Sequence, residues 1–164
     1  MQAIVVYESH WGSTAQIARA IAEGIGPDAR ALTTSEATPD VVAEADLVVA
    51  GSPVMAFGLP SEGMIANAAK DSRAPVAPDV SQPSLRSWLE QLRPGHAQAA
   101  AFETRLGWSR LGATGAIDDR LRRAGYQRIA KPAKFVVKGP YGPLREGEVE
   151  RARAWGTSLA AALG

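Results

Sequence analysis

Short apolar runs and helical repeats alternate along the chain. An uninterrupted apolar run at residues 3–7, and another that follows Asp46 in residues 46–51, predict strands that are buried on both faces of a sheet, as in parallel sheets. Between them, isoleucines recur at helical spacing from residue 14 to residue 25, with polar residues on the opposite face, and a Gly-Pro pair follows. This pattern predicts an amphipathic helix after the first strand.

The rest of the chain continues this alternation. Further strands are predicted at residues 29–33, 96–103 and 135–138. Helices are predicted at residues 39–45, 64–69, 85–92, 117–124 and 146–163, with a surface loop at 72–83, an irregular loop at 107–115 and a turn at 139–143. Parallel strands need crossovers that usually contain a helix, so the pattern predicts an α/β, doubly wound parallel sheet. At this length we expect a single domain over residues 1–164.

Composition removes several classes of function. The chain has no cysteine, which excludes disulfides, thiolate metal sites, iron–sulfur clusters and a cysteine nucleophile. Its net charge of +1 and the lack of any long apolar run lead us to expect no nucleic-acid or membrane partner. The first residues do not resemble a secretory signal, so we expect a cytoplasmic protein. The two histidines favour neither a metal site nor a Ser-His-acid catalytic set.

A turn rich in hydroxyl residues joins the first predicted strand to the first predicted helix. It consists of Ser9, His10, Trp11, Gly12, Ser13 and Thr14. Ligands of open α/β sheets bind at the carboxyl ends of the strands, and unpaired amides at a helix N-terminus bind anions. The turn lacks the glycine and lysine patterns of triphosphate and dinucleotide sites, and no Lys or Arg lies between Met1 and Ala18. We therefore predict a neutral cradle for one monoester phosphate.

Simpler interpretations of this turn stay open at this point. It can be an ordinary connection in which Ser13 or Thr14 caps the helix. His10 can be a general acid or a phosphate donor, although a lone histidine of this kind is more often a solvated loop residue.

The motif S-x-x-G-x-T in this turn resembles the phosphate-binding loop of the flavodoxin family. The chain is most similar to small bacterial flavodoxin-like proteins that combine a Y-E-S turn, a G-[AS]-P segment and a C-terminal helix like GPLREGEVERARAWG. The resemblance implies a flavodoxin-like, five-stranded sheet of order 2-1-3-4-5 with helices on both faces, and bound FMN. The phosphate would lie in the first loop, against residues 9–14. Around the flavin ring the resemblance places Ser52, Pro53, Val54, Met55, Ala56, Phe57, Gly58, Thr104, Arg105 and Trp108.

Within those ring loops, Phe57 and Trp108 are either the two aromatic walls of the ring or packing residues. The family also uses a glycine peptide such as that of Gly58 to bond the flavin N5 in its one-electron-reduced form. Val54 and Met55 stand where similar proteins often carry Thr and His.

Three functions follow from these residues. The first is an FMN-binding electron-transfer protein or oxidoreductase, whose flavin moves electrons to or from a redox partner protein or a small-molecule acceptor, with no catalytic side chain. The near-neutral charge argues against a dedicated low-potential carrier, since such carriers are usually strongly acidic. The second is a binding or regulatory module that has lost flavin, which Val54 and Met55 suggest. The third is an NAD(P)H-dependent quinone reductase. The oligomeric state stays open.

Overall fold

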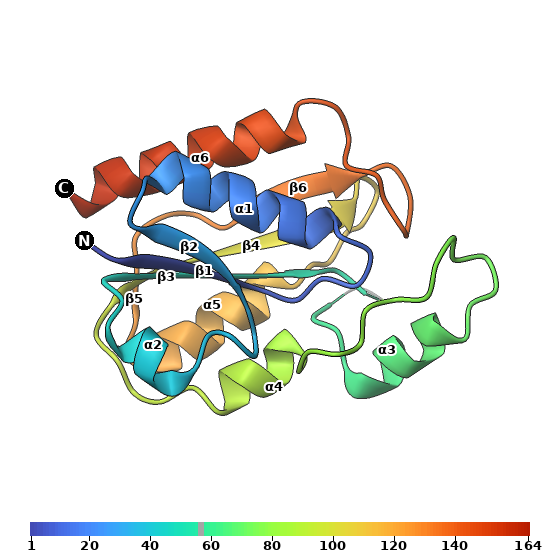
Figure 1. Ribbon diagram of the computed structural model, residues 1–164, viewed down its shortest axis with the longest axis horizontal. Helices are drawn as coiled ribbons and strands as arrows, with labels where there is room; N and C mark the ends of the chain where they lie inside the picture. Colours follow the sequence, from blue (N-terminus) through green and yellow to red (C-terminus); the bar gives the residue numbers. More distant parts are fainter. Residues whose placement is uncertain (56–57) are drawn as a thin grey trace.

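A parallel sheet with helices on both faces forms the framework of the protein in the computed structural model, which describes residues 1–55 and 58–164 (Figure 1). The described residues form six strands: β1 (Ala3–Tyr7), β2 (Ala29–Thr33), β3 (Leu47–Pro53), β4 (Gln98–Leu106), β5 (Gln127–Arg128) and β6 (Ala133–Val137). The sheet order is β2-β1-β3-β4-β5, and β6 also pairs with β4. The predicted fold class and strand order are confirmed.

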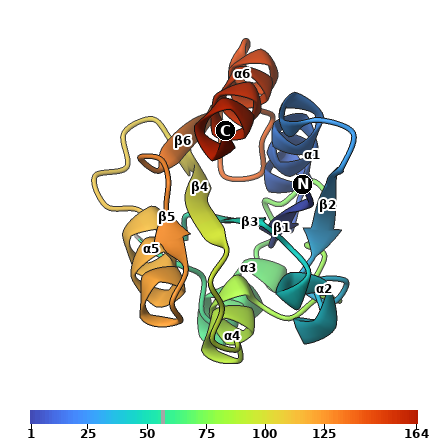
Figure 2. The same cartoon turned by 90° about the vertical axis from the view of Figure 1, so that its left-hand side faces the viewer.

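Two layers of helices cover the sheet. On one face lie α1 (Ser13–Ile25) and α6 (Glu148–Leu163) (Figure 2). The helices on the other side are α2 (Pro39–Ala43), α3 (Glu62–Ala69), α4 (Leu85–Glu90) and α5 (Thr114–Arg123), with α3 nearest the carboxyl ends of the strands (Figure 1). Among the described residues, no helix has the length and apolar content needed to span a membrane.

Two short strands share the fifth position of the sheet, where the sequence pattern predicted one strand at residues 135–138. Strand β5 pairs with the start of β4, and β6 pairs with its end from Phe102 to Leu106. Pro132 lies between the two strands and has no N–H to donate to a ladder, which explains the interruption. The two residues of β5 are too few to show a period in the sequence.

Strands β3 and β4 both continue further than predicted. Their pairing runs to Pro53 and Thr104, and β4 then pairs with β6 as far as Leu106. The segment from Thr104 onward was predicted as a ring-binding loop, yet Thr104 and Arg105 are 3% and 8% exposed. Thr104 and Arg105 therefore sit on a rigid strand at the carboxyl edge of the sheet.

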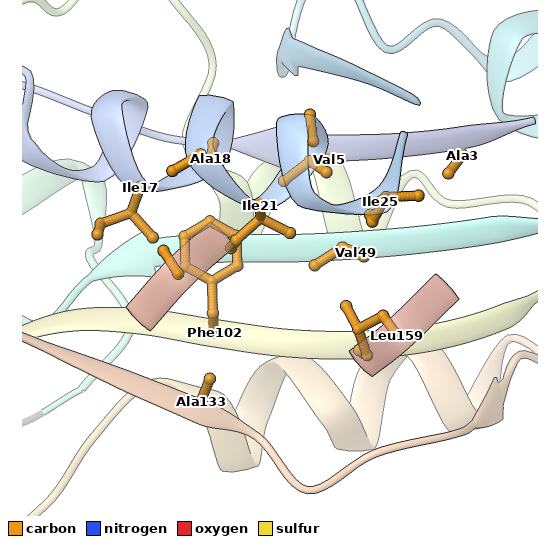
Figure 3. Close-up of a cluster of buried hydrophobic side chains, with 14 of the residues drawn as sticks. Ala3, Val5, Ile17, Ala18, Ile21, Ile25, Val49, Phe102, Ala133 and Leu159 are labelled. Atoms are coloured by element: carbon orange, nitrogen blue, oxygen red, sulfur yellow. The ribbon is translucent and has the colours of Figure 1, made fainter. Parts of the chain in front are cut away.

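Glycines fix the packing of α1 against α6. A Cβ at Gly24 would lie 2.0 Å from the Arg153 carbonyl oxygen, and one at Gly156 would lie 2.2 Å from the Ile21 carbonyl oxygen. The two helix backbones are therefore in direct contact. Beside this crossing, Ile21 packs with Phe102 and other buried side chains of the sheet (Figure 3). This contact sets the position of α1, and with it the position of the turn that precedes α1.

Gly156→Ala tests that contact. The added methyl group forces the two helices apart, so we expect the free energy of unfolding to fall by about 1–3 kcal/mol or more. Gly115→Ala in α5 is the matched control, because a Cβ there meets no atom within 4 Å. It should be neutral or stabilising by up to about 1 kcal/mol. Urea unfolding measures both changes, and equal values for the two variants would contradict the close contact.

Candidate functional site

A pocket of about 280 Å³ opens at the carboxyl ends of β1, β3 and β4. It collects residues from both predicted ligand-binding regions. They are Ser9, His10, Trp11, Ser13, Thr14, Pro53, Val54, Met55, Thr104 and Arg105. A larger cavity of about 1120 Å³ lies at the other end of the strands and contacts none of the predicted site residues. We assign the site to the smaller pocket, because ligands of this fold class bind at the carboxyl edge.

The first turn of α1 has no cap. Gly12 is the N-cap residue, with a left-handed φ of 101°, and no side chain accepts a hydrogen bond there. The Gly12 N–H donates to Ser9 Oγ at 3.2 Å, whereas the amides of Ser13, Thr14 and Ala15 have no partner among the described residues. The N-cap side chains of α2, α3 and α4, by contrast, all accept a backbone N–H. An ordinary turn capped by Ser13 or Thr14 is therefore wrong, and α1 offers an open anion site.

Thr14 connects this turn to the sheet. Its hydroxyl lies 2.7 Å from the hydroxyl of Thr104 on β4. Both residues are buried, at 2% and 3% exposure. Each hydroxyl has one donor and two acceptor positions, so Thr14 keeps the capacity for another hydrogen bond in the pocket.

His10 is held on both sides. Its Nε2 lies 2.6 Å from Glu8 Oε2, and its Nδ1 donates to the Asp79 carbonyl oxygen at 2.7 Å. Burial lowers the pKa of His10, but the hydrogen bonds and charges of Glu8 and Asp79 outweigh it and hold the pKa above its usual value. His10 is 8% exposed and neither ring nitrogen is free, so a solvated loop histidine is wrong and a bond from this ring to phosphate would require breaking a contact.

Buried carboxylates accept the first amides of two other helices. Glu8 Oε1 accepts the N–H of Leu85, the first residue of α4, at 2.7 Å. Glu103 Oε1 accepts the N–H groups of Ala113 and Thr114, at the start of α5, at 3.0 and 3.1 Å. The second oxygen of each carboxylate contacts a basic side chain that lines the pocket: His10 for Glu8 at 2.6 Å, and Arg105 for Glu103 at 3.2 Å.

The predicted surface loop at 72–83 packs against the phosphate turn. The Asp79 N–H donates to the His10 carbonyl oxygen at 2.9 Å, and Trp11 Nε1 donates to the Val76 carbonyl oxygen at 3.0 Å. This loop therefore supports the turn from outside the pocket.

Tyr141 is a pocket residue that the sequence interpretation missed. It lies in the Gly-Pro-rich turn after β6, and its ring packs edge-to-face on Trp11 at a centroid distance of 4.8 Å. Its hydroxyl donates to Asp71. An aromatic residue inside a Gly-Pro turn was the signal that could have identified it. Trp11 and Tyr141 are aromatic residues that line the pocket among the described residues.

The structure does not bring Trp108 to this pocket. Its side chain is 72% exposed, beyond the end of β4. Strand β4 continues to Leu106, three residues beyond the predicted end, so the loop that carries Trp108 begins further from the pocket than expected. Trp108 as a wall of the flavin ring remains a prediction without support from this pocket.

Other predicted ring residues have different surroundings. Ser52 is fully buried, and its hydroxyl donates to the Pro53 carbonyl oxygen at 3.1 Å rather than lining the pocket. Gly58 exchanges two backbone hydrogen bonds with Met55, each 2.9 Å long. The predictions for Ala56 and Phe57 lie outside the described residues.

The His10 contacts predict a pH-dependent stability. Because the folded-state pKa is raised, the contribution of protonated His10 is complete below about pH 6.5 and is lost as pH rises through the folded-state pKa. We expect the free energy of unfolding to decline as pH rises above about 6.5, and to decline less in His10→Gln. Urea midpoints across this range measure it. His96→Gln is the control, because His96 is exposed on the far side of the sheet. Identical slopes for the wild type and His10→Gln would contradict the assignment.

Comparison with known proteins identifies the fold. No protein-family model and no curated protein matches the sequence. A flavodoxin from the Archaea is 18% identical with a TM-score of 0.67, and a Pseudomonas aeruginosa flavodoxin is 16% identical with a TM-score of 0.68. Each alignment covers 99% of both chains. Rubredoxin oxygen:oxidoreductase from Desulfovibrio gigas is 19% identical with a TM-score of 0.63, and this chain spans 36% of its length. The protein therefore has the flavodoxin fold over essentially its whole length.

Proposed function

We propose that the protein binds FMN and uses it to transfer electrons. The observation that carries this proposal is the uncapped first turn of α1, which faces the pocket at the carboxyl edge of the sheet. At the starts of α3, α4 and α5, side chains accept the first amides. Helix α6 also has a glycine N-cap without a side-chain bond, but none of its residues lines this pocket. Within the described part of the chain no residue accepts those of α1, so they are available to a ligand in the pocket.

The donors at this turn suit a phosphate monoester. The amides of Ser13, Thr14 and Ala15 are unpaired, and the hydroxyls of Ser13 and Thr14 line the pocket. The N-terminus of α1 adds roughly half a positive charge. The left-handed Gly12 lets the backbone turn into the helix without a side chain above it.

The remaining walls suit a flat aromatic ring. Trp11 and Tyr141 provide aromatic surface, and Val54, Met55 and Leu106 provide apolar surface. The volume of about 280 Å³ lies just below the usual range for ligand pockets, about 300–1,000 Å³. It favours a mononucleotide over a dinucleotide.

Electron transfer follows from the flavin rather than from the side chains. Bound FMN supplies the redox chemistry, and the protein positions it and sets its electrostatic surroundings. The ring nitrogens of His10 are both occupied, so the pocket has no histidine ready to act as an acid or base. Flavodoxins and a flavodiiron core are among the structural neighbours, which supports this role. The electron partner is a redox protein or a small-molecule acceptor.

Ser13→Ala tests the phosphate position. The Ser13 hydroxyl has no hydrogen bond to a described residue, so its loss should leave the fold intact. A hydrogen bond to a charged group is worth about 1.5–3 kcal/mol, so FMN should bind about 10- to 100-fold more weakly. Quenching of flavin fluorescence measures the affinity.

Riboflavin is the ligand control, because it lacks the phosphate. It should bind the wild type more weakly than FMN and should be insensitive to Ser13→Ala. Equal binding of the two flavins would contradict the phosphate assignment. Failure of the wild type to bind FMN at near-millimolar concentration would favour a binding module without flavin.

A further inference from the structure

Arg105 is a buried cation beside the pocket. It is 8% exposed, and among the described residues it is the one guanidinium that lines this pocket. Its Nη1 donates to Glu103 at 3.2 Å and its Nε to the Leu106 carbonyl oxygen at 3.5 Å, whereas Nη2 bonds to none of the described residues. A guanidinium carries five N–H donors, so Arg105 retains donors for an acceptor in the pocket.

The partner of Arg105 does not cancel its charge. Glu103 also accepts two amides at the start of α5, from Ala113 and Thr114. The partial positive charge of this helix terminus offsets part of the negative charge of Glu103. Arg105 therefore keeps a positive potential toward the pocket.

Arg105 and the phosphate turn approach the pocket from different faces of the sheet. Successive residues of a strand point to opposite faces. Thr104 bonds to Thr14 on the α1 side, and Glu103 bonds to α5 on the other side. Arg105 shares the face of Glu103. Arg105 would therefore bind a different part of the ligand from the phosphate that α1 binds.

We propose that Arg105 binds the pyrimidine edge of the flavin ring and favours the reduced flavin over the oxidised one. The inference rests on the proposed binding of FMN. This edge carries two carbonyl oxygens, which accept hydrogen bonds from a guanidinium. Reduction by two electrons and one proton adds a negative charge to the ring, so a cation at this edge stabilises the reduced form more. Arg105 raises the two-electron potential of the bound flavin.

Three variants separate this role from structural support. Arg105→Gln removes the cation but leaves Glu103 as an unpaired buried carboxylate, which can prevent folding. The double variant Glu103→Gln/Arg105→Gln removes both charges and avoids this problem. Glu103→Gln leaves the cation without its counter-charge. For each protein, fluorescence titration measures affinity for FMN and for riboflavin, and titration with dithionite against a reference dye measures the two-electron potential.

The double variant should bind FMN and riboflavin about tenfold more weakly, with the ratio of the two affinities unchanged, because both flavins share the ring. The affinity for reduced FMN should fall about tenfold more than the affinity for oxidised FMN, which lowers the two-electron potential by about 30 mV. Glu103→Gln should shift the potential in the opposite direction. A general loss of structure would not shift the potential in opposite directions in these two variants.

Specific outcomes overturn the inference. A fall in FMN affinity alone would make Arg105 a phosphate ligand. Unchanged affinities and potentials in variants that fold would make the Glu103–Arg105 pair purely structural. If the wild type binds FMN and either of these outcomes is found, only the role of Arg105 is overturned. A wild-type protein that binds neither flavin overturns the proposed function and this inference together.

Discussion

The unpaired amides at the start of α1 are the constraint on which the site depends. A helix terminus that lies in a partly buried pocket needs an acceptor for these groups, and here no side chain supplies one. Other features hold this terminus in place. The direct contact at Gly24 and Gly156 sets the helix against α6, and the bond from Thr14 to Thr104 ties its first turn to β4.

Two buried carboxylates organise the surroundings of that terminus. Glu8 and Glu103 cap α4 and α5, and each also holds a basic side chain against the pocket. A buried ion pair adds little net stability, yet removing one partner of such a pair costs about 3–5 kcal/mol, because the other charge is left uncompensated. The pocket thus gains two basic side chains, His10 and Arg105, in a chain whose net charge is only +1.

Local patterns predicted the elements that depend on local physics. Strands β1 and β2 have the predicted bounds. The uninterrupted apolar run of β1 indicated a buried strand, and the isoleucine spacing predicted α1. The hydroxyl-rich turn also lies at the pocket, as expected from its place after the first strand. The end of β4, from Thr104 to Leu106, was missed because Thr104 and Arg105 are polar. Their burial is favourable only because Thr104 bonds to Thr14 and Arg105 bonds to Glu103.

Long-range contacts account for the rest. The orientation of the His10 ring depends on its hydrogen bond to Asp79. The aromatic wall of the pocket depends on Tyr141, which packs on Trp11 from a turn far along the chain. No spacing rule connects such residues. The roles of these residues can be recognised only in the folded protein, where the sheet brings the ends of its strands together.

The most direct measurement is the amide NMR spectrum of the protein during titration with FMN, riboflavin and inorganic phosphate. FMN and phosphate should both shift the amide signals of Ser13, Thr14 and Ala15, because each would place an anion on the open turn of α1. Riboflavin should leave these three signals in place while it shifts those of residues around the ring. Equal shifts with riboflavin, or no shift with FMN, would contradict an anion site at the start of α1.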